Sequence, residues 1–203
     1  MNMLELLIEI ENFHGSIEPN NIKLIVGKSN LSYDVQSKYD IIGNIDIYKH
    51  FKHCAFVVEK WKTSLNDAEC CVWSLLLDIS LSESKDFLNN IKSKKMENKL
   101  IEWLYFKQGI IMINRQGYAK DFRIFKKYQV SHVLIVSDYS YKVVLSNFDK
   151  LTKVGIVPHP SKQNWGILKD ETWGKHTNKH VKSAILKDFT FDKLLLEDFI
   201  IYE

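Results

Sequence analysis

Three apolar runs separated by turn residues lie between residues 109 and 145, and they constrain the fold more than any other stretch. Ile110–Ile113 is a continuous apolar run, which is typical of a strand buried on both faces. Residues 115–117 (Arg-Gln-Gly) contain a glycine that can adopt positive φ, so the next segment is predicted to fold back as a hairpin. Val133–Val136 is apolar and rich in β-branched residues, which predicts a central strand. A further strand is expected at Tyr141–Leu145.

The first sixty residues show the two-residue period of half-buried strands. Apolar residues alternate over Leu6–Ile10 and again over Ile22–Val26, where Gly27 ends the run. Residues 45–48 and 55–61 show similar short runs, with loop residues between the segments. This pattern predicts an N-terminal β-meander.

From about residue 64 to 108 the apolar residues recur at helical spacing. Ser64 and Asp67 have the spacing of a helix N-cap followed by an acid. Ser82 is predicted to cap a second helix, whose Phe87, Leu88 and Ile91 share a face. A third helix is expected from residue 96 to 107, with Leu100, Trp103 and Leu104 inward and Gly109 at its C-terminal cap.

Val154–Val157 is predicted as a strand that completes a central sheet over about residues 109–157. An ordered loop is expected after it, because Trp165 and Trp173 are too apolar to remain in water. Residues 177–188 have a helical pattern, so the C-terminal region is predicted to be helical. With no repeat or linker-like segment, the sequence predicts a single compact α+β domain spanning 1–203.

Composition limits the class of protein. The chain has 203 residues, of which 45% are hydrophobic and 12% aromatic, enough for a full core. No apolar run approaches ~20 residues, so no membrane partner is expected. The N-terminus lacks the basic start of a signal peptide. Cys54, Cys70 and Cys71 are odd in number and show no CxxC spacing, which favours buried thiols in a reducing compartment and predicts a cytoplasmic protein.

Asp46, Glu59 and Lys62 form the first candidate site. Two carboxylates on neighbouring strands with a nearby lysine resemble the arrangement of metal-dependent nucleases, in which the acids hold a divalent ion such as Mg²⁺. The spacing departs from the usual acid-x-lysine order, because Lys60 directly follows Glu59. On an extended strand Glu59 and Lys62 would point to opposite faces. The alternative is a solvated acid and exposed lysines on the polar side of a strand.

A second nuclease-like pattern lies in the strand, turn and strand predicted around residues 109–123. The positions that would hold the acids and the lysine of that pattern are Asn114, Asp121 and Arg123. An asparagine and an arginine are poor ligands for a cation. A site at this place would be catalytically degenerate.

His176 and His180 are four residues apart, which puts both imidazoles on one face of a helix. That spacing suits zinc or another transition metal, with His159 as a third candidate ligand. The pair lacks the glutamate of a metalloprotease helix, and the neighbouring lysines would repel a cation.

Basic residues interleaved with aromatic residues are the third candidate site. Lysines and arginines contact phosphates without reading sequence, and exposed aromatic rings stack on bases. The alternative is a solvated basic face over a core that uses the aromatic side chains. The residues are Lys120, Arg123, Lys126 and Lys127, together with Lys175, Lys179, Lys182, Trp165 and Trp173.

Several enzyme classes are unlikely because GxGxxG, GxxxxGK[ST], GxSxG and HExxH are absent from the sequence. The sequence predicts an intracellular protein that binds DNA or RNA, with a nuclease-like site that is either divalent-metal-dependent or degenerate. The alternative is a non-enzymatic interaction protein, such as an inhibitor, an immunity protein or an accessory subunit. Tyr139, Tyr141, Trp165 and Trp173 would then be its interface anchors.

Overall fold

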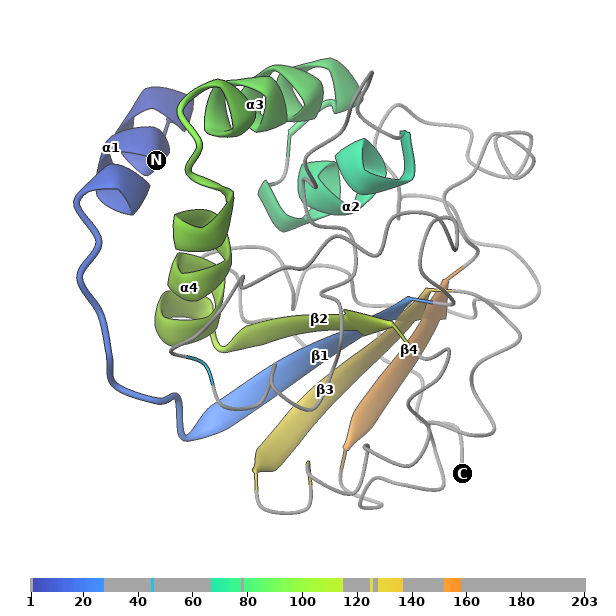
Figure 1. The fold of residues 1–203 in the computed structure, drawn as a ribbon. Coiled ribbons are helices and arrows are strands. Elements are labelled where there is room, and N and C mark those ends of the chain that lie inside the picture. The colour runs from blue at the N-terminus through green and yellow to red at the C-terminus, as the bar shows by residue number, and fades with distance from the viewer. Residues whose placement is uncertain are drawn as a thin grey trace, which may run out of the picture.

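The computed structural model describes residues 2–27, 45, 67–77, 79–114, 125, 128–136 and 152–157, and only these are discussed structurally below. Four helices and four strands lie in this part of the chain (Figure 1). In chain order they are α1 (Met3–Glu11), β1 (Asn21–Gly27), α2 (Asp67–Leu77), α3 (Leu81–Ser93), α4 (Glu97–Gln108), β2 (Ile110–Asn114), β3 (Gln129–Val136) and β4 (Lys153–Val157).

The four strands form a parallel sheet in the order β2-β1-β3-β4. β1 pairs with β2 on one side and with β3 on the other, and β4 pairs with β3. The connection from β1 to β2 runs through the helical segment α2–α4, as parallel neighbours require a long crossover. The helices gather on one side of the sheet in the view of Figure 1.

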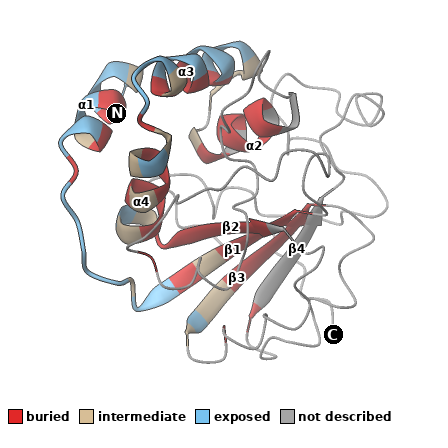
Figure 2. Ribbon diagram, in the orientation of Figure 1, coloured by how far each residue is buried: buried red, intermediate tan, exposed pale blue. Residues whose placement is uncertain are grey.

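Strands β1, β2 and β3 each contain a segment that is buried on both faces. Successive residues of a strand point to opposite faces, and Leu24, Ile25 and Val26 are all fully buried. Val133–Val136 and Ile110–Ile113 show the same burial, which Figure 2 displays as continuous red strands. The predictions of buried strands at these two places are confirmed, and so is the strand at 154–157. Val133–Val136 is also central, because β3 lies between β1 and β4.

The predicted strand over Leu6–Ile10 is wrong, because these residues belong to helix α1. Asn2 Oδ1 accepts a hydrogen bond from the Glu5 backbone N–H at 2.9 Å, and the Glu5 carboxylate accepts one from the Asn2 N–H. This reciprocal capping box starts the helix. Leu6 and Ile10 lie one turn apart on the buried face, whereas Ile8 is 48% exposed. An alternation over five residues is compatible with both the strand period and the helix period. The capping box decides in favour of the helix.

The predicted β-meander is also wrong for the described residues. A meander pairs antiparallel neighbours along the chain, but β1 pairs in parallel with two strands that follow it far along the sequence. The turn of the hairpin predicted after Ile113, at residues 115–117, and the strand predicted at Tyr141–Leu145 lie outside the described residues. Within the described part of the chain, the strand neighbour of β2 is β1.

The helical segment predicted over about 64–108 is confirmed from residue 67 onward. Phe87, Leu88 and Ile91 share the buried face of α3, as predicted. The predicted cap at Ser82 is wrong by two residues. Ser80 is the N-cap, and its Oγ accepts from the Glu83 N–H at 3.3 Å while the Glu83 carboxylate accepts from the Ser80 N–H at 2.9 Å.

The side chains of α2 and α3 pack together. The rings of Trp73 and Phe87 have centroids 6.2 Å apart. Ser84 Oγ, which is buried in this contact, donates a hydrogen bond to the Cys70 carbonyl at 2.7 Å. Cys70 itself is buried, as predicted for this cysteine.

Gly109 ends α4 and leads directly into β2, which confirms the predicted C-terminal cap. Its φ is 63°, in the left-handed region that favours glycine. Its N–H donates to the Tyr105 carbonyl, and its own carbonyl accepts from the Lys23 N–H, both at 2.8 Å. Leu100, Trp103 and Leu104 of α4 face inward, as predicted.

The described residues therefore combine helices with a sheet, which agrees with the predicted α+β class. No helix within them is long and apolar enough to cross a membrane. The C-terminal region predicted to be helical, from residue 158 onward, lies outside the described residues.

Candidate functional site

The carboxyl ends of the four strands meet at one edge of the sheet, which we call the carboxyl edge. Gly27 of β1 is in register with Asn114 of β2, and Val136 of β3 is in register with Val157 of β4. β1 connects to a strand on one side, and β3 connects to a strand on the other side. This reversal makes the space outside β1 and β3 a topological switch point, where open parallel sheets bind ligands.

The sequence continues past these strand ends with residues that carry chemistry. Lys28 follows Gly27, and Arg115 follows Asn114, so a cation comes immediately after each member of a registered pair. Lysine and arginine are the usual side-chain contacts to phosphate.

Asp138 and His159 follow the ends of the other two strands in the sequence. Each is the second residue after a registered strand end, Val136 for the aspartate and Val157 for the histidine. A carboxylate and an imidazole at neighbouring strand ends are the residue types used for general acid–base chemistry. The side-chain positions of these residues, like those of Lys28 and Arg115, lie outside the described part of the chain.

The opposite, amino edge of the sheet is joined by hydrogen bonds. The pairing of β1 with β3 shifts register between Ile22 and Lys23, and Ser131 is the extra residue of this bulge. Ser131 Oγ donates to the Ile22 carbonyl at 3.4 Å and lies 2.6 Å from His132 Nδ1. Thr152 Oγ1 donates to the Val130 carbonyl at 3.0 Å. The polar side chains here connect strands to one another.

The second nuclease-like pattern has one described residue, Asn114 at the end of β2, and its Asp121 and Arg123 lie outside the described residues. Asp46, Glu59 and Lys62 lie outside the described residues, and so do His176 and His180. Asp46 directly follows Ile45, which is fully buried in the core. Within the described residues no cluster of three or more His, Cys, Asp or Glu side chains is arranged to hold a metal ion. Both metal-site hypotheses remain predictions.

The third candidate site also lies outside the described residues in its named members: Lys120, Arg123, Lys126, Lys127, Lys175, Lys179, Lys182, Trp165 and Trp173. Two aromatic residues interleaved with its first group are described. Phe125 is only 2% exposed and belongs to the core, and Tyr128 packs against the core while half-buried. Phe125 is therefore a core side chain rather than a stacking platform, as the alternative interpretation of this group expects.

Sequence reasoning did not select Lys28, Arg115, Asp138 and His159 as one set. The signal that could have found them is the continuous apolar run, which is typical of parallel strands buried on both faces. In a parallel sheet the residues after each run gather at one edge, even when they are distant in sequence. The candidate sites predicted from the sequence are instead sets of residues that are close together along the chain.

Several exposed charged side chains of the described helices make polar contacts. Two hydrogen bonds from Ser80, first from its hydroxyl and then from its backbone N–H, lower the pKa of Glu83. Lys94 Nζ lies 3.9 Å from Glu11 Oε2, and Lys107 Nζ lies 4.0 Å from Glu9 Oε1, in pairs that are largely exposed. Lys99 Nζ donates to the Glu11 carbonyl. Exposed pairs of this kind contribute little to stability.

Comparisons of the chain with protein-family models, with curated proteins and with solved structures find no match.

Proposed function

We propose that this chain binds nucleic acid at the carboxyl edge of its parallel sheet. The observation that carries the proposal is the registered pair Gly27 and Asn114 beside the switch point, because a cation follows each of them in the sequence. Two cations at adjacent strand ends suit a phosphate group. The interleaved basic and aromatic residues at 118–128 and 162–182 support a polymeric ligand, since they offer further phosphate and base contacts.

Two hydrolytic sites are compatible with this proposal, and they differ in their need for metal. Asp46, Glu59 and Lys62 would require a divalent ion such as Mg²⁺. Asp138 and His159 would act as a general acid–base pair and would need none. Either site would act on a nucleic acid held by Lys28 and Arg115.

The test is fluorescence anisotropy with labelled single- and double-stranded DNA and RNA at two salt concentrations. We expect salt-sensitive binding by the wild-type chain and at least a tenfold weaker affinity for the Lys28→Ala/Arg115→Ala double variant, because two phosphate contacts are removed together. The matched control, Lys85→Ala/Lys107→Ala, removes the same charge from exposed positions on α3 and α4. Equal affinity losses in the two variants would refute the carboxyl-edge location, and no binding by the wild type would refute the function.

The same samples test for hydrolysis. They are incubated with and without Mg²⁺, and the products are separated by size. Activity lost without Mg²⁺ and in Asp46→Ala would support the metal site. Metal-independent activity lost in Asp138→Asn and His159→Gln would support the acid–base pair.

A non-enzymatic protein-interaction function is the second candidate. It is favoured by Leu4, Ile8 and Ile17, which are 66%, 48% and 86% exposed. Leu4 and Ile8 are one turn apart on the outer face of α1, a position where apolar side chains can contact another protein. The proposed interface anchors Tyr139, Tyr141, Trp165 and Trp173 lie outside the described residues. Leu4→Glu/Ile8→Glu should abolish capture of a specific partner if this function is correct, and unchanged capture would exclude this face.

A further inference from the structure

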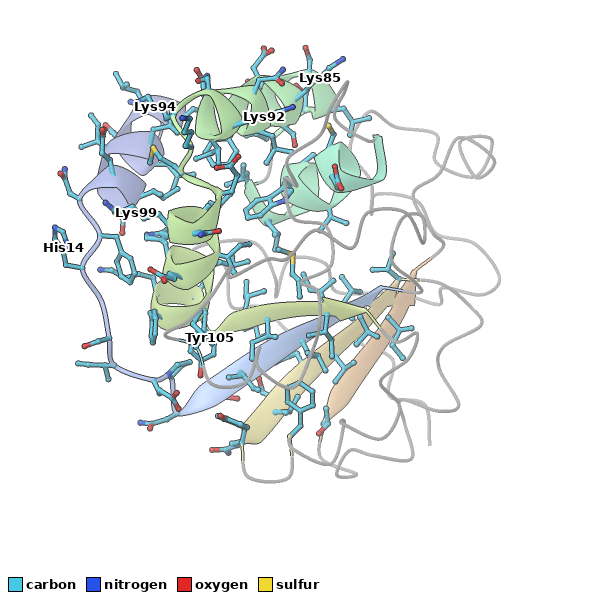
Figure 3. All side chains as sticks on the ribbon, viewed as in Figure 1. His14, Lys85, Lys92, Lys94, Lys99 and Tyr105 are labelled. Carbon is cyan, nitrogen blue, oxygen red and sulfur yellow. The ribbon has the colours of Figure 1, made fainter. Side chains whose placement is uncertain are left out.

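Four lysines lie within eight residues at and beside the turn between α3 and α4: Lys92, Lys94, Lys95 and Lys99. We call this set the lysine corner. Figure 3 shows Lys92, Lys94 and Lys99 on the helical layer, away from the sheet. Glu97 is the one acid within the same eight residues. The corner therefore has a local excess of positive charge that the core does not require.

Lys95 occupies a backbone position that favours glycine. Its φ is 56°, and within the described residues it is the non-glycine residue with positive φ. The Lys95 N–H donates to the Lys92 carbonyl at 3.1 Å, and the Met96 N–H donates to the Ile91 carbonyl at 3.0 Å. These two bonds form a Schellman motif, in which the residue at the Lys95 position must be left-handed and is usually glycine.

The same chain has glycine at the end of the next helix. Gly109 follows α4 with a φ of 63°, close to that of Lys95. A lysine at the Lys95 position carries a conformational penalty that glycine avoids. Residues held in strained conformations are often retained because their side chains have a function. The side chain of Lys95 is exposed, so that function would be exercised at the surface.

Two neighbouring lysines are partly occupied within the protein. Lys99 donates to the Glu11 carbonyl, and Lys94 lies 3.9 Å from the Glu11 carboxylate with 45% of its side chain exposed. These contacts connect the corner to the C-terminal end of α1. Lys95 is exposed, and among the described residues no ion pair involves it, so its charge is available to a ligand at the surface.

We infer that the lysine corner, with Lys95 at its centre, is a second contact surface for the phosphate backbone of nucleic acid. The inference rests on the proposed function and extends it to a surface remote from the carboxyl edge. Lysines are strongly hydrated point charges without sequence readout, which suits contact with a repeating phosphate chain. An acidic protein or an anionic lipid surface is a different partner, and the test separates it.

The Lys95→Gly variant tests the inference, because it removes the charge while relieving the backbone conformation. The thermal unfolding midpoint of the full chain should be unchanged or higher than in the wild type. Removing one phosphate contact should lower the slope of log affinity against log salt by about 0.9. Between about 50 and 200 mM salt, the affinity of the variant should therefore fall roughly threefold less than that of the wild type. Lys85→Ala is the control, since it removes one exposed charge from α3, the helix that precedes the turn at Lys95.

Several outcomes would overturn the inference. Equal salt slopes for Lys95→Gly and Lys85→Ala would show an effect of net charge alone. An unchanged slope in Lys95→Gly, with a weakened Lys28→Ala/Arg115→Ala variant, would remove the lysine corner and leave the proposed function intact. Absence of wild-type binding to all nucleic acids would instead remove the proposed function. Lys95-dependent binding to vesicles containing phosphatidylserine, without such dependence for nucleic acid, would assign the corner to a lipid surface.

Discussion

At the amino edge of the sheet, hydrogen bonds donated by the Ser131 and Thr152 hydroxyls and by the Lys23 N–H to the Gly109 carbonyl join neighbouring elements, whereas the carboxyl edge is followed by charged and polar residues. The difference separates two tasks in one sheet. The Ser131 and Thr152 hydroxyls and the Gly109 carbonyl are paired within the protein and support the strand register. At the carboxyl edge, the sequence supplies residues suited to a ligand.

This division predicts opposite phenotypes at the two ends. Substitutions at the amino edge should lower stability and leave the affinity of the folded protein for nucleic acid unchanged. Substitutions of the residues that follow the carboxyl edge should lower affinity and change stability less, because they remove proposed ligand contacts and none of the hydrogen bonds that join the strands at the amino edge. Any variant with the opposite phenotype would break the comparison.

The largest loss of stability is expected for Gly109→Ala. A Cβ at this position would lie 2.7 Å from the Asn21 carbonyl oxygen, and the residue must adopt a φ of 63°. Strain and the backbone displacement together should lower the free energy of unfolding by about 3 kcal/mol. Urea unfolding measures this change, and the affinity for nucleic acid is measured below the unfolding transition.

Gly15→Ala is the matched control for that variant. A Cβ at Gly15 would approach the far end of the buried Phe13 ring rather than backbone, and Gly15 does not adopt the positive φ that Gly109 requires. Its loss of stability should therefore be smaller. A loss as large as that of Gly109→Ala would show that the junction of α4 with β2 is not a special constraint on the amino edge.

A smaller effect is expected for Thr152→Val. The substitution keeps the shape of the side chain and removes the donor to the Val130 carbonyl, and Thr152 is only 4% exposed. The free energy of unfolding should fall by about 1–2 kcal/mol, since a largely buried acceptor loses its hydrogen bond. Thr152→Ser keeps the hydroxyl and should retain most of the stability. Equal losses in both variants would assign the effect to packing of the methyl group instead.

The sequence allowed the buried strands to be predicted because their apolar runs are continuous. Ile110–Ile113 and Val133–Val136 need no partner information to be recognised as interior segments. Their pairing could not be predicted in this way. β1 lies between β2 and β3, and the crossover between β1 and β2 includes three helices, so local periodicity carries no information about this contact.

The strand prediction near the N-terminus was wrong for a different reason. Over Leu6–Ile10 the apolar residues match both a strand and a helix, and the Asn2–Glu5 capping box was the decisive local signal. The candidate sites are limited by the same lack of pairing information. The grouping of Asp46 with Glu59 depends on neighbouring strands of the predicted meander. In the parallel sheet, residues come together when they follow the ends of paired strands.

The smallest predicted effect concerns Glu83, which belongs to neither edge and so tests whether the division is confined to the sheet. Hydrogen bonds from the Ser80 hydroxyl and N–H lower the pKa of Glu83 in the folded chain. A folded pKa below the unfolded value means that the ionised carboxylate stabilises α3 above the unfolded pKa. That contribution is lost as pH falls through the folded pKa.

Glu83→Gln should therefore lower the thermal unfolding midpoint slightly at neutral pH, and its difference from the wild type should shrink in acid. Asp86→Asn, on the next turn of α3, is the control for removal of one negative charge. Affinity for nucleic acid should be the same in both variants, because α3 is capped at Ser80 and the lysine corner lies at its other end. If Glu83→Gln weakened binding while Asp86→Asn did not, the helix cap would influence the ligand, and the functional surface would extend beyond the carboxyl edge and the lysine corner.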